Sequence, residues 1–488
     1  MSVHLELTVQ ALFLVSILKN MNSWHKAIAQ PATEFEQTNL RVLEGEIPAQ
    51  LQGTLYRNGP ARLAIGKQKV GHWFDGDGAI LGVNFAQQTA TANYKYVQTQ
   101  GYLAEQKAQK YLFANYGMTA AGAFWNNIVK PVKNSANTSV LALDNRLLAL
   151  WEGGVPHGLD LETLATKGAD NLSDTLNNLP FSAHPKVDPV TGEIFNFGVS
   201  PGRKNTLYIY KCNSLGSVTK QIEFSLSGLP IIHDFVLAGS YLVFLISPVR
   251  TNTLAILSGR KSYSDAMEWQ PELGTQILIF DRHDLSLVSQ SQTDPWYQWH
   301  YSNGYLNSDR NIVIEFIRYP NFQTNEFLRE VAQGKIQTKA KGTLWQAIID
   351  PQKAKVLETK QLLDRQCEFP IVNPAKVGQS WRYTYLNTHL DEQDRGQELF
   401  TAIARFDRQT GSLAVAQMGE NFYPSEPIYV SATNDNSLSW VITVVYNGNL
   451  DRSEVWIYDS DHLEEKPVCR LVLPSVIPHS FHGTWKAA

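Results

Sequence analysis

Short apolar runs separated by polar turn residues recur from about residue 38 to the end of the chain. In one example, the apolar run 138–143 is followed by Asp144-Asn145 and then by a second apolar run, 146–151. Two such runs joined by a short polar turn predict a β-hairpin. Because this pattern dominates the chain, the sequence predicts an all-β domain.

An apolar strand that ends on an aspartate and leads into a polar turn occurs four times. The four aspartates are Asp281, Asp350, Asp407 and Asp459, and the intervals between them are 69, 57 and 52 residues. These intervals are longer than the repeat of WD40 proteins and too irregular for a strict repeat. They fit four-stranded propeller blades that carry insertions of different lengths.

Helical periodicity is rare in this sequence. The clearest amphipathic segment is 103–132, in which large apolar residues are mixed with few charges. Its large apolar residues are Leu112, Phe113, Tyr116, Met118, Phe124, Trp125, Ile128 and Val129. We therefore expect a helix in this segment.

Length and charge are those of a large globular protein. The chain has 488 residues, of which 43% are apolar, and a formal net charge of -4, which gives no argument for binding nucleic acid. Length alone suggests about three domains. No Gly/Ser-rich or Pro-rich linker divides the chain, so we expect residues 38–488 to form one domain.

Residues 1–37 are interpreted as an N-terminal extension. The apolar run 11–18 is too short to span a bilayer, and no Lys or Arg precedes it as in a secretory signal. The extension is then either a frayed tail or a consequence of translation that starts at Met21. Cys212, Cys367 and Cys469 lie far apart, and none belongs to a C-x-x-C pair. A reducing compartment such as the cytoplasm is therefore expected.

Four histidines lie in apolar or tight-turn contexts far from one another: His184, His233, His300 and His482. Their spacing excludes a zinc finger or a helical H-E-x-x-H site, in which the ligands lie a turn or two apart. Taken singly, each is more often a hydrogen-bonded core residue than a ligand. If they act together, the fold must gather them, and a radially repeated fold brings one strand end from each repeat to a common axis.

Seven short phrases, in order along the chain, carry a family resemblance. They are Gly53–Pro60, Phe74–Gly78, Lys133–Thr138, Leu150–Gly154, Ser182–Pro185, Cys367–Pro370 and the ending His482–Trp485. The chain resembles the carotenoid cleavage oxygenase family, and within it the cyanobacterial branch that cleaves apocarotenoids. The resemblance implies a seven-bladed β-propeller, capped by a dome of loops and helices, with Fe(II) held on the axis by four histidines.

The resemblance also implies roles for the histidines and for three glutamates. The metal ligands would be His184, His233, His300 and His482, with His479 as the rival for the last place. Glutamates that hold the ligand rings would be Glu152, Glu368 and Glu426. Four neutral imidazoles leave open positions at which iron can bind O2. A carboxylate on the second ring nitrogen fixes the orientation and tautomer of a ligating histidine.

The residues next to these glutamates and histidines are candidates for the substrate tunnel. Trp151, Trp299 and Phe369 would place aromatic rings at the wall of the metal cavity, which suits a flat, polarisable polyene. The alternative is that they are ordinary core aromatics. In the lignostilbene-cleaving branch a lysine stands where Trp151 is, so the chain resembles a phenol cleaver less. Thr138 would lie beside an open metal position and restrict it, or would simply start a strand.

These implications lead to one expected function and three alternatives. The expected function is iron(II)- and O2-dependent cleavage of a carbon–carbon double bond in an apocarotenoid, giving two carbonyl products such as an apocarotenal or retinal. The alternatives are a stilbene-type oxygenase, a polyene isomerase on the same scaffold, and a propeller binding module with a structural metal.

Carotenoids partition into membranes, so the enzyme would need a route from the bilayer to the metal. The segment 103–132 has lysines at its borders, as expected of an interfacial helix whose apolar face lies among lipid tails; they are Lys107, Lys110, Lys130 and Lys133. The expected membrane patch consists of Phe113, Phe124, Trp125 and Ile128. A helix packed in the dome is the alternative. The expected location is the cytoplasm, with peripheral attachment to a membrane.

Overall fold

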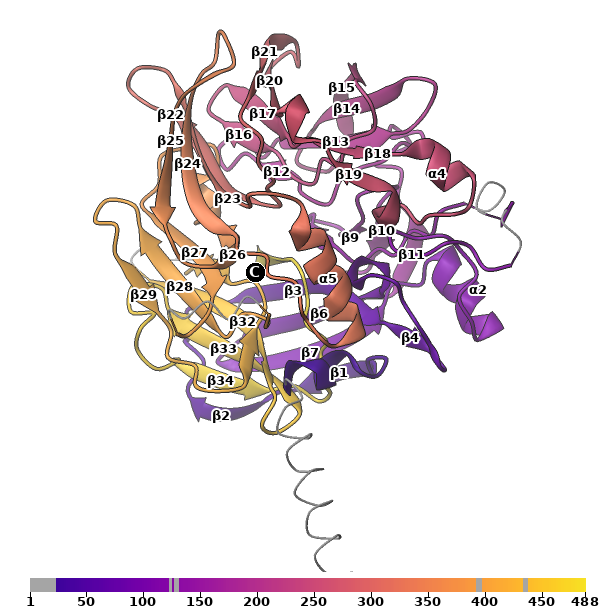
Figure 1. Cartoon of the computed structure of the whole chain (residues 1–488). Helices are drawn as coiled ribbons and strands as arrows, with labels where there is room; N and C mark the ends of the chain where they lie inside the picture. Colours follow the sequence, from indigo (N-terminus) through magenta and orange to yellow (C-terminus); the bar gives the residue numbers. More distant parts are fainter. Residues whose placement is uncertain (1–22, 123–124, 127–130, 392–396, 433–437) are drawn as a thin grey trace, which may run out of the picture.

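Seven β-sheets are arranged around a central axis and form a β-propeller (Figure 1). The computed structural model describes residues 23–122, 125–126, 131–391, 397–432 and 438–488. Apolar side chains fill the spaces between neighbouring sheets; one cluster, for example, joins strands of the fourth and fifth sheets. The predicted all-β, seven-bladed propeller is confirmed.

Blades 1 to 4 contain the strands between residues 35 and 293, except one strand of blade 7 and two short hairpins, together with the last strand of the chain. Blade 1 consists of β1 (Phe35–Asn39), β7 (Thr89–Tyr96), β6 (Asp77–Ala86), β3 (Gly53–Arg62) and β35 (Gly483–Ala487). Blade 2 consists of β8 (Ser139–Ala142), β9 (Leu147–Leu150), β10 (His157–Leu159) and β11 (Thr166–Ala169). Blade 3 consists of β12 (Lys186–Val187), β13 (Ile194–Ser200), β14 (Asn205–Cys212) and β15 (Val218–Leu226). Blade 4 consists of β16 (Val236–Ala238), β17 (Tyr241–Ile246), β20 (Thr275–Asp281) and β21 (Leu287–Thr293).

Blades 5 to 7 complete the ring. Blade 5 consists of β22 (Tyr301–Leu306), β23 (Ile312–Arg318), β24 (Thr343–Asp350) and β25 (Lys355–Leu363). Blade 6 consists of β26 (Cys367–Ile371), β27 (Tyr383–Thr388), β28 (Ala402–Asp407) and β29 (Leu413–Val415). Blade 7 consists of β30 (Phe422–Pro424), β31 (Ile428–Ser431), β32 (Ser439–Asn447), β33 (Arg452–Asp459), β34 (Cys469–Val472) and β2 (Arg41–Gly45).

Strands from both ends of the chain close the ring. The last strand, β35, pairs with β3 of blade 1, and β2 pairs with β34 of blade 7. Blades 1 and 7 are thus each built from both ends of the chain, so the closed ring protects sheet edges that an open sheet would expose.

Helices and short hairpins lie between the strands and build the dome. The helices are α2 (Gln100–Ala108), α4 (Thr253–Leu257) and α5 (Gln323–Gln333), with short 3-10 turns η1 (Ser23–Ile28), η2 (Trp73–Asp75), η3 (Ser264–Ala266), η4 (Pro271–Leu273) and η5 (Pro374–Lys376). The hairpins are β4 (Ala64–Ile65) with β5 (Gln68–Lys69) and β18 (Val249–Thr251) with β19 (Met267–Trp269). In the described part of the chain, no helix is long and apolar enough to cross a membrane.

The four strands that end on aspartate have one position in common. They are β20, β24, β28 and β33, and each is the third strand across its sheet, counted from the edge strand β16, β22, β26 or β30 of blades 4 to 7. Each aspartate then accepts a hydrogen bond from the N–H two residues later, at 2.7 to 2.9 Å. An aspartate that bonds its own backbone in this way forms a tight turn. The predicted hairpin 138–151 is also confirmed, as β8 paired with β9.

The predicted helix over 103–132 is wrong in its extent. The helix α2 ends at Ala108, and Gln109 leaves it in the left-handed conformation, at φ 51°. The N–H groups of Leu112 and Phe113 then donate to the buried Glu105 carboxylate, at 2.8 and 3.3 Å. These bonds hold the chain in an irregular path over 111–122.

The segment 23–37 packs into the propeller, although it was assigned to an extension outside the domain. Trp24 of η1 is 0% exposed, and Phe35 of β1 pairs with Tyr94 of β7. The apolar run 11–18 and Met21 lie outside the described residues.

Candidate metal centre

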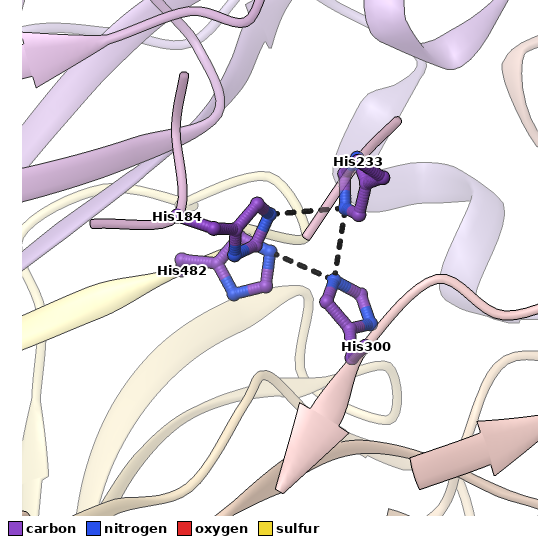
Figure 2. A group of neighbouring side chains, drawn as sticks. All are labelled: His184, His233, His300 and His482. Carbon is purple, nitrogen blue, oxygen red and sulfur yellow. Dashed lines mark hydrogen bonds between the residues drawn. The ribbon is translucent and has the colours of Figure 1, made fainter. Parts of the chain in front are cut away.

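The four histidines predicted from the sequence meet on the propeller axis (Figure 2). Each lies just before an edge strand of its blade: His184 before β12, His233 before β16, His300 before β22 and His482 before β35. Because these strands begin at the centre of the ring, residues separated by 49 to 182 positions face one another.

The ring nitrogens converge as metal ligands do. Their ligand atoms all lie within 4.8 Å of one another, and successive Nε2 atoms from His184 through His233 and His300 to His482 are 3.0, 3.1 and 3.2 Å apart. Two nitrogens bound at right angles to one metal at roughly 2.1 Å would lie about 3.0 Å apart. The donor set therefore fits one metal ion on the axis.

Three glutamates hold the other ring nitrogen of three histidines. Glu152 contacts His233 Nδ1, Glu368 Oε2 lies 2.5 Å from His300 Nδ1, and Glu426 Oε1 lies 2.8 Å from His482 Nδ1. Among the described residues, no carboxylate contacts the ring of the fourth histidine, His184. Glu152 follows β9, Glu368 lies in β26 and Glu426 lies between β30 and β31. Each of the seven blades thus contributes one histidine or one glutamate.

Burial favours the neutral form, which a metal requires, for His184 and His482, whereas the Glu368 carboxylate outweighs burial at His300 and raises its pKa. Burial, with the neighbouring histidines, lowers the pKa of His184 well below its usual range. Burial also lowers the pKa of His482, and the Glu426 carboxylate offsets this only in part. Burial raises the pKa of Glu368 and Glu426, but their histidine partners outweigh it and leave both pKa values below the usual range.

Asp234 supports the centre, although its role was not predicted. Its Oδ1 lies 2.7 Å from Lys186 Nζ, and its Oδ2 accepts a hydrogen bond from Tyr301 N–H at 3.1 Å. These contacts join the starts of the strands that follow His184 and His300. The only sequence signal is its position directly after His233.

Two other residues that support the centre, Arg57 and Tyr319, were also not predicted from the sequence. Arg57 Nη1 donates to the Glu426 carbonyl at 2.7 Å, and Arg57 Nη2 donates to the Phe481 carbonyl at 2.8 Å. Tyr319 donates its hydroxyl to Glu368 Oε1 at 3.1 Å. Arg57 lies in one of the phrases that carry the family resemblance, which was a usable signal.

A cavity of about 360 Å³ is lined by three of the four histidines, His233, His300 and His482. Thr138, Trp151, Trp299 and Phe369 all line it. The Trp299 ring meets the His233 ring edge-on, with centroids 4.9 Å apart.

Phe369 packs against the centre from a constrained backbone. Its ring is stacked on the His300 ring at 5.3 Å and lies 5.4 Å from the His482 ring. Its backbone is left-handed, at φ 53°. A bulky residue in this conformation is strained, and such residues cluster at functional sites.

The expected membrane patch is only partly described. Trp125 is 56% exposed and Phe113 is half-buried, whereas Phe124 and Ile128 lie outside the described residues. Lys133, expected at the membrane border, is buried and contacts Asp77 and Glu105, both at 2.6 Å. That part of the prediction is wrong, because Lys133 belongs to a buried ion network.

His479, the rival ligand, faces away from the four-histidine cluster. Its Nε2–H donates to the Trp24 carbonyl at 3.0 Å, and His482 fills the fourth place in the cluster.

Comparison with known proteins agrees with this geometry. The family model of the retinal pigment epithelial membrane protein, RPE65, matches residues 28–487. The apocarotenoid-15,15'-oxygenase of Synechocystis sp. is 32% identical over 91% of this chain and 92% of that protein. Resveratrol cleavage oxygenase 1 of Aspergillus fumigatus is 25% identical over 90% of this chain and 91% of that protein. The crystal structure of cobalt-substituted Synechocystis ACO matches 96% of this chain and 98% of its own, with 30% identity and a TM-score of 0.86. The chain therefore belongs to the RPE65 family of carotenoid oxygenases.

Proposed function

We propose that the protein is a non-haem iron(II) oxygenase that uses O2 to cleave one carbon–carbon double bond of an apocarotenoid. The two products would be carbonyl compounds, such as an apocarotenal or retinal. One observation carries the proposal: His233, His300 and His482 line a mostly apolar cavity that can hold a long polyene beside the metal. The Synechocystis relative, an apocarotenoid oxygenase, supports the substrate class.

The choice of metal rests on the ligands. Four neutral imidazoles suit divalent first-row metals, and four ligands leave open positions in an octahedral shell. The cobalt-substituted relative supports a metal of this class. Bound iron(II) would supply the activation of O2.

The residues of the chain bind and orient the reactants. Glu152, Glu368 and Glu426 accept the Nδ1–H of their histidines, so that each Nε2 lone pair faces the axis. Trp151 and Trp299 hold the flat polyene by apolar contact. The double bond that lies nearest the metal would be the one cleaved, so the position of cleavage depends on the register of the polyene in the cavity.

Thr138 limits the space beside one ligand. Its carbonyl accepts a hydrogen bond from His482 N–H at 3.3 Å, and its hydroxyl donates to Asn137 Oδ1 at 3.2 Å. The threonine therefore stands next to His482 at the cavity wall, where it would restrict one open metal position.

A stilbene is the second candidate substrate, because the Aspergillus relative is a resveratrol cleavage oxygenase. The position at which the lignostilbene branch carries a lysine is Trp151 here, which cannot form an ion pair with a phenolate. Lys261 also lines the cavity, but it is exposed. A polyene remains the better fit.

Substrate would enter from a membrane surface near α4. Leu254 and Leu257 of α4 are 77% and 54% exposed, and Val132 is 57% exposed. Ile256 of the same helix and Val132 line the cavity, so the exposed apolar side chains lie beside part of the cavity wall. Each side chain buried in lipid would contribute about 1.5–3 kcal/mol to attachment. Changing Leu254 and Leu257 to Ser should reduce sedimentation with liposomes but leave turnover of detergent-solubilised substrate unchanged; unchanged sedimentation would contradict this route.

Product analysis after reconstitution with Fe(II) tests the proposed reaction. The protein would be loaded anaerobically and then given O2 with matched apocarotenals, carotenoids and hydroxystilbenes. We expect two carbonyl fragments from an apocarotenal, with oxygen from O2, and no cleavage of the stilbenes. Cleavage of stilbenes alone would favour the second candidate. Isomerised but uncleaved polyene, or no reaction by the iron-loaded protein, would contradict the oxygenase proposal.

A further inference from the structure

The two sides of the cavity differ in polarity. Around blades 3 and 4 its wall is apolar and includes Phe197, Val199, Leu229, Ile231 and Ile232. Around blades 6 and 7, next to Leu399 and Phe400, four amide and hydroxyl side chains form a polar wall: Gln366, Asn387, Ser425 and Ser480. A polyene with one oxygenated end would therefore place that end on the side of blades 6 and 7.

The two serines of the polar wall are already paired. Ser480 Oγ lies 3.0 Å from Ser425 Oγ and also accepts a hydrogen bond from the buried Arg57 Nε at 3.0 Å. Because each hydroxyl already has a partner, the serines do not require a ligand.

The two amides of the polar wall each keep an unpaired acceptor. Asn387 is 1% exposed and Gln366 is 5% exposed. Asn387 Nδ2 donates to the Pro424 carbonyl at 2.9 Å, which fixes the amide orientation because a carbonyl can only accept. Gln366 Nε2 likewise faces the Ala340 carbonyl at 3.4 Å. Within the described residues, neither Asn387 Oδ1 nor Gln366 Oε1 has a hydrogen-bond donor.

These two acceptors lie on one face of one hairpin. Asn387 of β27 is paired with Glu368 of β26, and Gln366 lies two residues before Glu368. Gln366 directly precedes the first residue of β26, and side chains two apart on extended backbone share a face, so Gln366 and Asn387 are diagonal neighbours, roughly 7–8 Å apart. Leaving a buried acceptor unpaired is unfavourable, so a donor is expected in the cavity beside them.

We propose that Gln366 and Asn387 form a subsite for a hydroxyl group at the oxygenated end of the polyene. An alcohol can donate a hydrogen bond to either amide oxygen, whereas an aldehyde or a plain hydrocarbon end cannot. The subsite would fix which end of the substrate lies beside blade 6, and with it the register of the polyene at the metal. This inference rests on the proposed function, because it assumes a polyene in the cavity.

Binding of a matched alcohol and aldehyde tests the subsite without turnover. An apocarotenol and the apocarotenal of equal length would be titrated without O2, and their affinities read from quenching of tryptophan fluorescence. We expect the wild type to prefer the alcohol by about fivefold, the effect of one net hydrogen bond. Gln366→Met and Asn387→Leu should each reduce this preference, whereas Gln366→Glu, which keeps an acceptor, should retain it.

Asn196→Leu is the matched control. Asn196 is also buried, donates to a carbonyl, that of Ser182, at 2.8 Å and has an unpaired Oδ1, but it does not line the cavity. This variant should keep the alcohol preference of the wild type. Equal affinity of the wild type for both ligands, or an equal loss of preference in Asn196→Leu, would overturn the subsite and leave the oxygenase proposal intact. If the wild type bound neither polyene, the proposed substrate class would fail as well.

Discussion

Two buried clusters of ionisable side chains stand close to the cavity and differ in completeness. One is the Lys133 network of Arg62, Asp77, Glu105 and Lys133, and the other is the axial cluster of four histidines and three glutamates. In the Lys133 network each charge meets an opposite one: Arg62 lies 2.7 Å from Asp77, and Lys133 lies 2.6 Å from both Asp77 and Glu105. Its charges are balanced within the protein.

The axial cluster lacks such a balance on one side. Three of its Nδ1 atoms face glutamates, but its four Nε2 atoms face one another at 3.0 to 3.2 Å between successive members. Neutral imidazoles that point their lone pairs at one another need a cation between them. A buried polar cluster in which every charge has its partner within the protein indicates a structural role. One that lacks a partner indicates a binding site.

Removing an axial histidine should produce the largest effect on activity. His300→Ala takes away one of four ligands, and we expect cleavage of an apocarotenal to fall to near background, measured by product chromatography. His479→Gln is the control, because that histidine is buried nearby but donates to Trp24 instead. Loss of activity in His479→Gln and not in His300→Ala would reverse the assignment of the ligands.

Breaking the Lys133 network should lower stability without removing the metal. Lys133→Met leaves Asp77 and Glu105 with only Arg62 to balance them, which should lower the free energy of unfolding by about 3–5 kcal/mol. The double variant Lys133→Met with Glu105→Gln restores the charge balance and should recover part of that loss. Denaturant unfolding measures both, and loss of metal from Lys133→Met would contradict the separation of the two clusters.

Changing the glutamates of the axial cluster should have an intermediate effect. Glu368→Gln and Glu426→Gln remove the carboxylates that hold His300 and His482, and metal affinity or turnover should fall by roughly 10–100-fold. Glu152→Gln should act in the same way through His233. Competition with a chelator measures the affinity. Wild-type affinity in all three variants would show that the carboxylates do not act through the ligands.

Replacing His72 should have the smallest effect. Unlike the axial histidines, this buried histidine is paired at both ring nitrogens by backbone groups of the protein. Its Nδ1 accepts from Phe74 N–H at 3.1 Å, and its Nε2–H donates to the Asn325 carbonyl at 3.2 Å, so both nitrogens are paired. Burial, only partly offset by the bond to Asn325, lowers its pKa to about 3. Below pH 6.5, His72 is protonated in the unfolded chain but stays neutral in the folded chain. The free energy of unfolding therefore falls as pH falls.

This loss can be measured against a variant. Between pH 6.5 and 5, the loss of unfolding free energy due to His72 amounts to about 1.6 kcal/mol. His72→Asn, which keeps an acceptor for Phe74 N–H, should lose correspondingly less stability over this range in urea titrations. An identical pH dependence in both proteins would show that His72 titrates normally.

The fold and the axial residues were predictable because their signals are local. Aspartates that close a strand predict a turn, and short phrases around His184 and His482 identify the family. The helix over 103–132 was wrong because its end depends on Glu105, whose partner Lys133 lies beyond the whole segment. Lys133 looked like a border residue, since a sequence does not show that Asp77 and Glu105 meet it. The left-handed backbone of Phe369 and the unpaired amides likewise arise only in the folded chain.

Metal analysis of the reconstituted protein tests the central claim most directly. The wild type, His300→Ala and Lys133→Met would be loaded anaerobically with Fe(II), desalted and analysed for iron per folded chain. The account predicts close to one iron in the wild type and in Lys133→Met, and almost none in His300→Ala. Iron retained by folded His300→Ala, or absent from the wild type, would contradict a metal centre on the propeller axis.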